Sequence, residues 1–282
     1  MRMPRPWPAY AALAAIVAAG LLLRLHHLRH GLPDVFHADE AQHFTSRAMR
    51  MFGGDLNPHY FQNPSGFTYL LYAVLRVGHG GGPPFDDVGR LVAQYASDPT
   101  AVYATGRAVA TVLCMLAVVA VFEVGRRLWE PAAGVAAAAV LAFAFLTVTY
   151  SRYAVTDTGA LLPVAVAVYA AVRAHEDGRL RYFLLAGAAV GLAVGFKYTA
   201  GLAGVTLVAA ALLRVRDDRR VIARLAVGGA AAAAVFFVTT PFFFLDLPVA
   251  LDQLGDQSQV ADRPKLGQGE GGAGAYYLRS LS

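Results

Sequence analysis

The sequence predicts an all-α integral membrane protein, a polytopic helical bundle with about seven transmembrane helices. Three observations predict this class. Hydrophobic residues make up 57% of the 282 residues and charged residues only 15%, about ten percentage points below a typical soluble domain. The apolar residues gather in long runs, as membrane spans require. Short arginine-rich loops separate those runs, and loops of this kind face the cytoplasm.

The formal net charge of +5 fits these basic loops. A nucleic-acid partner is not expected, because no basic face with interleaved aromatic residues is evident. Membrane lipids are the expected surroundings. The single cysteine, Cys114, lies inside an apolar run, so there is no disulfide framework and we expect a small buried side chain.

The first span is expected at residues 8–25, after the basic residues Arg2 and Arg5. A cleavable signal peptide is the alternative interpretation. However, Arg24 and His26 follow the run where a small-residue cleavage site should lie. We therefore expect an uncleaved anchor whose N-terminus is cytoplasmic.

Residues 26–100 form a long polar segment that contains all but one of the histidines. Within it, residues 39–52 read as an amphipathic helix, with two acids in the first turn, where the helix dipole favours them. Such a helix can lie flat on the membrane surface. A second helix is expected at residues 67–77, and it is too short to span the bilayer.

The other spans follow as apolar runs along the chain. Residues 182–213 are too long for one straight span and rather short for two, and we expect two short spans that meet near Lys197. Pro241 stops the last span, and residues 242–282 form a polar, Gly-rich external segment. The whole chain, 1–282, is interpreted as one transmembrane domain. The remaining spans are expected at residues 101–128, 131–150, 158–172, 182–213 and 221–240.

The basic residues occupy every second loop, and these loops are therefore assigned to the cytoplasm. A single span over residues 182–213 would turn the basic segment 214–224 outward, against this rule. The loops between the basic ones are then extracytoplasmic, and they bring several ionisable side chains to one membrane face. These side chains are Asp39, Glu40, Arg152, Asp157 and Lys197.

Ionisable groups at span ends that line a shared cavity are functional by default. A carboxylate can act as general base on an acceptor hydroxyl. A lysine or arginine can hold a leaving phosphate by charge and hydrogen bonding. The set therefore suits a transfer reaction on a membrane-bound donor at the extracytoplasmic face of the cell membrane.

Several short motifs, in their order relative to the spans, resemble the GT-C membrane glycosyltransferases. The closest group is the protein O-mannosyltransferase and lipid A aminoarabinose transferase type, glycosyltransferase family 39-like, and the resemblance covers essentially the whole chain. The motifs are Asp39-Glu40 after the first span, Asn63-Pro64-Ser65-Gly66 before a short helix, Arg107 in the second span, Ser151-Arg152-Tyr153 leading to Asp157, and Phe196-Lys197-Tyr198-Thr199.

The resemblance implies an inverting transfer from a polyprenyl-phosphate-linked sugar to a protein, lipid or glycan acceptor, with the catalytic site in the first external loop. Asp39 matches the family's catalytic acidic position, and we expect it to be the general base. Glu40 matches the second acid of that pair, Asp157 the acid of the second external loop, and Lys197 a basic position associated with the lipid phosphate. The residues expected to bind substrate are Lys197, Arg152, Arg107, His43 and Tyr198.

Two features depart from the family pattern. Pro64-Ser65 stands where the family commonly has Pro-Pro, and family members usually run well past this length. The last residues, 276–281, read as the lead-in to a further span. We therefore expect an N-terminal portion of a longer enzyme, which leaves the activity of this polypeptide itself undecided.

Other interpretations stay open. The spacing Glu40-x-x-His43 places two potential ligands on one helical face, so no cofactor is assigned but a divalent metal remains an alternative. Lys197, Arg152 and Arg107 can also serve as interfacial anchors. At the level of the whole chain, the alternatives are a transporter or flippase for a lipid-linked substrate and a non-catalytic remnant of the enzyme family. Transporters place ionisable residues near the midplane, often in internal repeats, whereas here the acids lie outside the expected spans.

Overall fold

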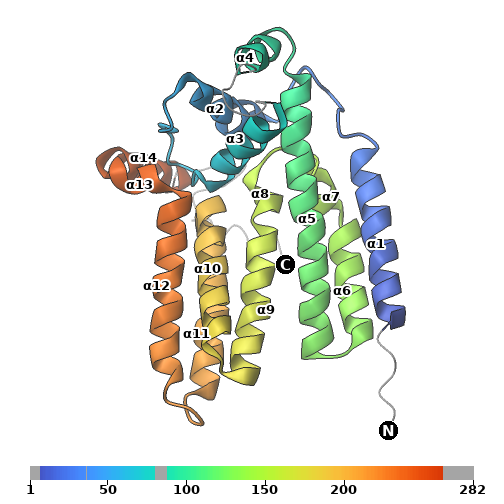
Figure 1. The fold of residues 1–282 in the computed structure, drawn as a ribbon, viewed down its shortest axis with the longest axis vertical. Coiled ribbons are helices and arrows are strands. Elements are labelled where there is room, and N and C mark those ends of the chain that lie inside the picture. The colour runs from blue at the N-terminus through green and yellow to red at the C-terminus, as the bar shows by residue number, and fades with distance from the viewer. Residues whose placement is uncertain (1–6, 36, 80–87, 263–282) are drawn as a thin grey trace.

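The computed structural model describes residues 7–35, 37–79 and 88–262. Within these ranges the ordered elements are helices, and no strand is present. Figure 1 shows long helices running side by side as a bundle, with short helices gathered over one end. The predicted all-helical architecture is therefore observed.

Four helical stretches are long and apolar enough to cross a membrane: Trp7–Leu25, Thr100–Leu128, Thr156–Asp177 and Val221–Thr239. They correspond to α1 (Trp7–Leu25), α5 (Thr100–Leu128), α8 (Thr156–Gly159) with α9 (Leu161–Asp177), and α12 (Val221–Thr239). The other expected spans are built from shorter helices. These are α6 (Pro131–Phe143) with α7 (Phe145–Tyr150), α10 (Leu180–Phe196), and η3 (Tyr198–Ala203) with α11 (Gly204–Arg214).

The third expected span is not continuous. Ala144 adopts an extended conformation, with φ −59° and ψ 133°, and separates α6 from α7. The Thr147 hydroxyl donates to the carbonyls of Leu141, at 2.6 Å, and Ala144, at 2.8 Å. The Ala144 carbonyl also accepts from the N–H of Val148, so the bond to Leu141 is the one that replaces a helical donor lost at the break. Such pairing is the condition for irregular backbone at membrane depth.

The apolar stretch at residues 182–213 forms two short helical segments, as expected. α10 ends at Phe196, and Lys197 is extended, with φ −150° and ψ 122°. The chain then reverses through η3 into α11. The extended residue places the lysine at the turn between the two segments.

The expected helix at residues 39–52 is present as three consecutive pieces: the π-helix η1 (Glu40–Phe44), α2 (Thr45–Arg50) and the 3₁₀-helix η2 (Met51–Gly53). Gly54 ends it in the left-handed region, at φ 98°. α3 (Gly66–His79) matches the second expected short helix.

Three further helices were not expected: α4 (Val88–Ser97), α13 (Pro241–Leu245) and α14 (Leu247–Asp262). All three lie at the same end of the bundle as α2 and α3 (Figure 1). The segment that the sequence predicts to be a polar, Gly-rich tail contains α13 and α14. The α14 helix mixes apolar and polar residues, and hydrogen bonds from Asn57 to Asp246 and from Phe61 to Gln253 tie the segment to a distant loop.

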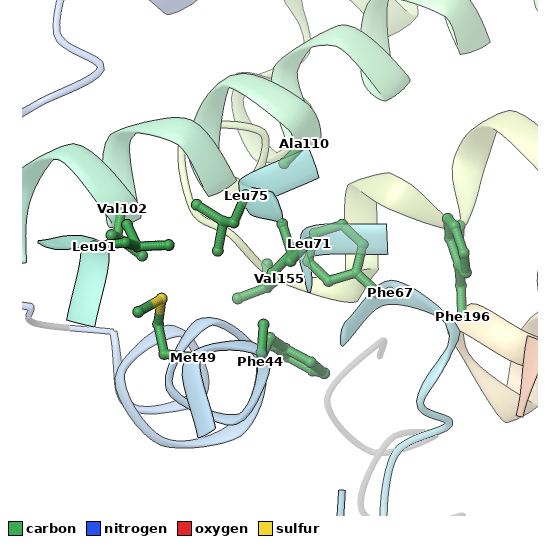
Figure 2. Close-up of a cluster of buried hydrophobic side chains, with 12 residues drawn as sticks. Phe44, Met49, Phe67, Leu71, Leu75, Leu91, Val102, Ala110, Val155 and Phe196 are labelled. Carbon is green, nitrogen blue, oxygen red and sulfur yellow. The ribbon is translucent and has the colours of Figure 1, made fainter. Parts of the chain in front are cut away.

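The buried apolar cluster of Figure 2 holds the first external helix, α3 and α4 on the bundle. Phe44 and Met49, from the first external helix, pack with side chains of α3, α4 and α5 and with Phe196 at the end of α10. The cluster includes Phe67, Leu71, Leu75, Leu91, Val102, Ala110 and Val155. It therefore holds the segment that carries Asp39 against the ends of α5 and α10.

Candidate active site

The chain segments that carry the expected site residues meet at one end of the bundle. Figure 1 shows the first external helix, α8 and the last turn of α10 at this end, while the loops joining α5 to α6, α9 to α10 and α11 to α12 lie at the other. Asp39, Asp157 and Lys197 belong to the first group of segments, and the basic loops to the second. We call the first group the acidic end. These three residues therefore lie at one end of the bundle.

Glu40 is fully buried and forms a two-pronged ion pair with Arg107 of α5. Both carboxylate oxygens accept from the guanidinium, at 2.8 Å each, and the Arg107 side chain is only 2% exposed. The backbone N–H of Ala154 also donates to Glu40, at 2.8 Å. Arg107 in turn donates to the carbonyls of Leu28, at 3.0 Å, and His30, at 2.8 Å. The pair thus ties four segments together, and the oxygens of Glu40 are occupied.

Asp39, the neighbouring residue, is accessible. Its side chain is 52% exposed, and one of its oxygens lies 3.8 Å from Nε2 of His43. Burial lowers the pKa of His43 from its usual value, and the opposing charge of Asp39 offsets only part of this effect. His43 is therefore mainly neutral at pH 7. The two acids directly follow one another, so the buried one holds the accessible one in place.

Stacked aromatic rings lie beside Asp39. The ring of His43 stacks on that of Tyr60, with centroids 4.7 Å apart and an interplanar angle of 2°. The Arg47 guanidinium also lies over the Tyr60 ring, at 4.2 Å. On the other side of Asp39 in the chain, His37 contacts the rings of Tyr150 and Tyr153.

Asp157 and Lys197 form an ion pair between α8 and the end of α10. Each side chain is more than a third exposed, at 38% and 37% respectively. Asp157 lines a cavity of about 350 Å³, the Asp157 cavity, with Leu146, Thr147, Tyr150, Thr158 and Leu161. Lys197 lines another of about 340 Å³, the Lys197 cavity, with Gln62, Asn63, Tyr198, Thr199, Leu254, Gln257 and Ser258. The ion pair thus connects the two cavities.

Residues near Asp39 in space reach both cavities. Tyr150, which contacts His37, also lines the Asp157 cavity. Tyr60, which stacks on His43, accepts a hydrogen bond of 2.8 Å from Asn63, and Asn63 lines the Lys197 cavity. The structure therefore brings the Asp39 segment and the Asp157–Lys197 pair into one continuous group of side chains.

Tyr198 joins the Lys197 cavity to the first external loop. Its hydroxyl donates to the carbonyl of Phe61 at 2.9 Å, and the N–H of Phe61 donates to Gln253 of α14 at 2.7 Å. Asn57 donates to Asp246 at 3.1 Å, just before α14. The helix α14 thus forms one wall of this cavity.

Arg152 lies elsewhere. Its guanidinium donates to the carbonyl of Leu23 near the end of α1. It lines a third cavity, of about 350 Å³, with His27, His30, Arg107, Thr149 and Tyr153. We call this the α1–α5–α7 cavity. Arg152 and Lys197 therefore line different cavities.

Sequence reasoning missed two features of the site. Arg24 is fully buried at the end of α1 and donates to the Ser151 hydroxyl at 2.7 Å and to the Ala142 carbonyl at 2.9 Å. The available signal was an arginine inside an apolar run, which we used only to argue against cleavage. The second feature is α14, whose residues Gln257 and Ser258 line the Lys197 cavity without belonging to a motif.

Glu40 and His43, the two potential metal ligands, have different partners in the structure. Both oxygens of Glu40 accept from Arg107, whereas His43 faces Asp39. Over the described ranges, no three His, Cys, Asp or Glu side chains gather as a metal site would require. These residues therefore do not fit a metal centre, and no step below uses one.

Comparison with known proteins identifies a family and a solved structure that this chain resembles. The family model for dolichyl-phosphate-mannose-protein mannosyltransferase matches residues 101–243. A solved structure of the Saccharomyces cerevisiae protein O-mannosyltransferase Pmt1–Pmt2 complex bound to the sugar donor superposes with a TM-score of 0.65 and 20% sequence identity. The superposition covers 89% of this chain and 35% of the yeast chain. The search of curated protein sequences finds no match.

The apolar helices and the superposition define a multi-pass membrane protein with the GT-C fold. The chain belongs to the dolichyl-phosphate-mannose-protein mannosyltransferase family. The fold class and family predicted from the sequence motifs are thus confirmed. The chain spans about a third of the length of the yeast protein, 35% by residues.

Proposed function

We propose that this chain contains the catalytic centre of an inverting transferase that moves a sugar from a polyprenyl-phosphate donor to a hydroxyl of an acceptor. One observation carries the proposal: an accessible Asp39 lies next to a fully occupied Glu40, at the end of the bundle where an exposed Asp157–Lys197 pair connects two cavities. The yeast structure with a similar fold is a protein O-mannosyltransferase bound to its sugar donor. This similarity supports a mannose donor and a protein acceptor here.

In the proposed reaction, the Asp39 carboxylate accepts the proton of the acceptor hydroxyl. The hydroxyl oxygen then bonds to the anomeric carbon as the bond from that carbon to the phosphate oxygen breaks. Attack from the face opposite the leaving group inverts the anomeric configuration. The bonding electrons leave with polyprenyl phosphate.

Lys197 is the proposed partner of the leaving phosphate. Its ammonium now contacts one carboxylate, Asp157, and is more than a third exposed, so it retains donors for a second anion. A fixed positive charge stabilises the negative charge that develops on the phosphate oxygen. Asp157 keeps that ammonium at the boundary of the two cavities, and we propose that it positions Lys197.

The remaining residues have supporting roles in this proposal. Glu40 and Arg107 position Asp39 by anchoring its segment. His43, which is mainly neutral, stacks with Tyr60 to form a flat surface suited to a sugar or peptide face beside the proposed base Asp39. Tyr198 is held by Phe61 and shapes the Lys197 cavity, whose amide and hydroxyl groups can hydrogen-bond a sugar.

The role of Asp39 is tested by the substitution Asp39→Asn, which keeps the shape of the side chain but removes its basicity. We expect transfer from polyprenyl-phosphate mannose to a Ser/Thr peptide to fall by roughly 10²- to 10⁴-fold, the usual contribution of a general base. The assay uses membranes that contain the protein. Asp34→Asn, an exposed acid of the same loop, is the matched control and should retain activity. Full transfer by Asp39→Asn, or an equal loss with Asp34→Asn, would contradict the role.

A further inference from the structure

The α1–α5–α7 cavity, lined by His27, His30, Arg107, Thr149, Arg152 and Tyr153, contains none of the side chains proposed to contact the donor or acceptor of the transfer. It lies apart from the Asp157–Lys197 pair, which lines the two other cavities. Of the described residues that line it, two are arginines, two are histidines and none is acidic. Its chemistry therefore favours an anion.

Arg152 supplies the positive charge of the cavity that no carboxylate of the described residues neutralises. The positive charge of Arg107 is matched by Glu40 in their buried pair. Arg152, by contrast, donates to a backbone carbonyl, that of Leu23. Its Nε–H is buried and has no hydrogen-bond partner in the described parts of the chain. A guanidinium with an unmet buried donor and no carboxylate partner is a natural contact for a phosphate oxygen.

The position of the cavity relates it to the bilayer. The carbonyl that Arg152 contacts belongs to the last turn of α1, an expected membrane span. Large apolar side chains of the two flanking helices are exposed nearby in sequence: Leu22 is 70% and Leu25 44% exposed in α1, and Phe145 is 79% and Leu146 66% exposed in α7. A basic pocket at the edge of an apolar surface offers cations to a lipid phosphate and apolar side chains to the attached hydrocarbon chains.

We propose that the α1–α5–α7 cavity binds the phosphate group of a membrane lipid, with Arg152 as its main contact. Thr149 supplies a hydroxyl, and His27 and His30 supply ring nitrogens at the same wall. The acyl or prenyl chains then lie along the exposed apolar side chains of α1 and α7. Free inorganic phosphate lacks those chains and would leave that apolar surface uncovered.

The cavity wall is also connected to the Asp39 segment. Residues 149–153 continue directly into Ala154, whose N–H donates to Glu40. Arg107 reaches from the cavity to the same carboxylate. A phosphate bound at Arg152 would therefore brace the turn that holds Glu40.

The proposal is tested by lipid binding to the detergent-purified, delipidated protein, followed by native mass spectrometry. The probes are phosphatidylglycerol, a polyprenyl phosphate and inorganic phosphate, each titrated separately. We expect at least one of the two lipids to bind the wild-type protein, and Arg152→Gln to weaken that binding about tenfold, the effect of one charge-assisted hydrogen bond. The tighter of the two lipids identifies the source of the phosphate.

Two further variants make the result decisive. Thr149→Glu places a carboxylate in the cavity and should weaken lipid binding while leaving the Arg152 side chain intact. Arg216→Gln, an exposed arginine of the opposite basic end, removes the same charge elsewhere and should leave binding unchanged. The titrations are repeated in a Lys197→Met background, which removes the phosphate contact proposed for the transfer site. Binding that Arg152→Gln weakens in this background belongs to the α1–α5–α7 cavity, so failure of this proposal is distinguishable from failure of the transfer mechanism.

Three outcomes would overturn the proposal. The first is equal lipid binding by wild type, Arg152→Gln and Thr149→Glu. The second is an equal loss with Arg216→Gln, which would indicate attraction by overall charge. The third is binding of inorganic phosphate alone, without either lipid.

Discussion

At the scale of single residues, two adjacent carboxylates have opposite environments. Successive residues of a helix point about 100° apart, so one of the pair can face the protein while the other faces the solvent. Glu40 is buried on Arg107, and Asp39 is half exposed beside His43. This division of roles, one acid that anchors and one that is free to react, follows from burial and hydrogen bonding.

The anchoring role predicts a large loss of stability for Glu40→Ala. Removing one partner of a buried ion pair leaves the other charge uncompensated, at a cost of about 3–5 kcal/mol. The double variant Glu40→Ala with Arg107→Met should recover part of this loss, because no buried charge remains. Thermal unfolding in detergent measures both effects.

The matched control is Glu123→Ala, which removes the partly exposed pair with Arg126 and an exposed hydrogen bond from Tyr10. Pairs near the surface contribute about 0–1 kcal/mol, so this variant should unfold close to wild type. Equal unfolding temperatures for Glu40→Ala and wild type would exclude the anchoring role.

At the scale of helices, close approach of backbones joins α10 to α12. A methyl group added at Gly187 would lie 1.9 Å from the carbonyl oxygen of Gly228, and one at Gly191 would lie 2.2 Å from that of Ala232. Small residues permit such contacts, and in membranes van der Waals packing replaces the hydrophobic drive between helices. The glycines of α10 therefore set the separation of these two helices.

Gly187→Ala should consequently push α10 from α12 and lower stability by about 1–3 kcal/mol, the usual cost of overpacking. Gly229→Ala, on α12 itself, is the control, because a methyl group there meets nothing within 4 Å. Replacing glycine in a helix interior is favourable by about 0.5–1 kcal/mol, so the control should be neutral or stabilising. Thermal unfolding of both variants in the same detergent measures this difference in stability. A Gly187→Ala protein as stable as the control would refute the packing argument.

At the scale of the whole molecule, the bundle has two chemically different ends. The basic loops gather at one end, and the Asp39, Asp157 and Lys197 segments gather at the other (Figure 1). Loops rich in arginine remain in the cytoplasm. We therefore propose that the acidic end is extracytoplasmic, as a reaction on externally presented lipid-linked donors requires.

Cysteine labelling in intact cells tests this orientation. Cys114 is fully buried and should stay unlabelled, which leaves single introduced cysteines as reporters. A membrane-impermeant maleimide should label Asp34→Cys in intact cells and Arg216→Cys only after lysis. The reverse pattern would place the proposed active site in the cytoplasm and contradict the proposed function.

Much of the architecture was predictable from local signals. The apolar runs predicted the long spans, because a bilayer demands a minimum apolar length. The excess length of residues 182–213 predicted the two segments that meet at Lys197. The acids at the start of the helix near residue 39 and the motifs around Arg152 and Lys197 pointed to the family. The helix α14 was missed, because its place depends on Gln253 and Asp246 meeting a loop nearly two hundred positions away in the sequence, at separations of 192 and 189 residues.

The sequence by itself thus determined the class of protein, the approximate spans and the end at which the candidate residues lie, since hydropathy and loop charge act residue by residue along the chain. Only the tertiary structure decided which acid is free, which cavity Arg152 lines and what closes the Lys197 cavity. Those properties depend on contacts such as Glu40 with Arg107 and Arg24 with Ser151. Packing brings such partners together from distant parts of the chain, and no local pattern records the pairing.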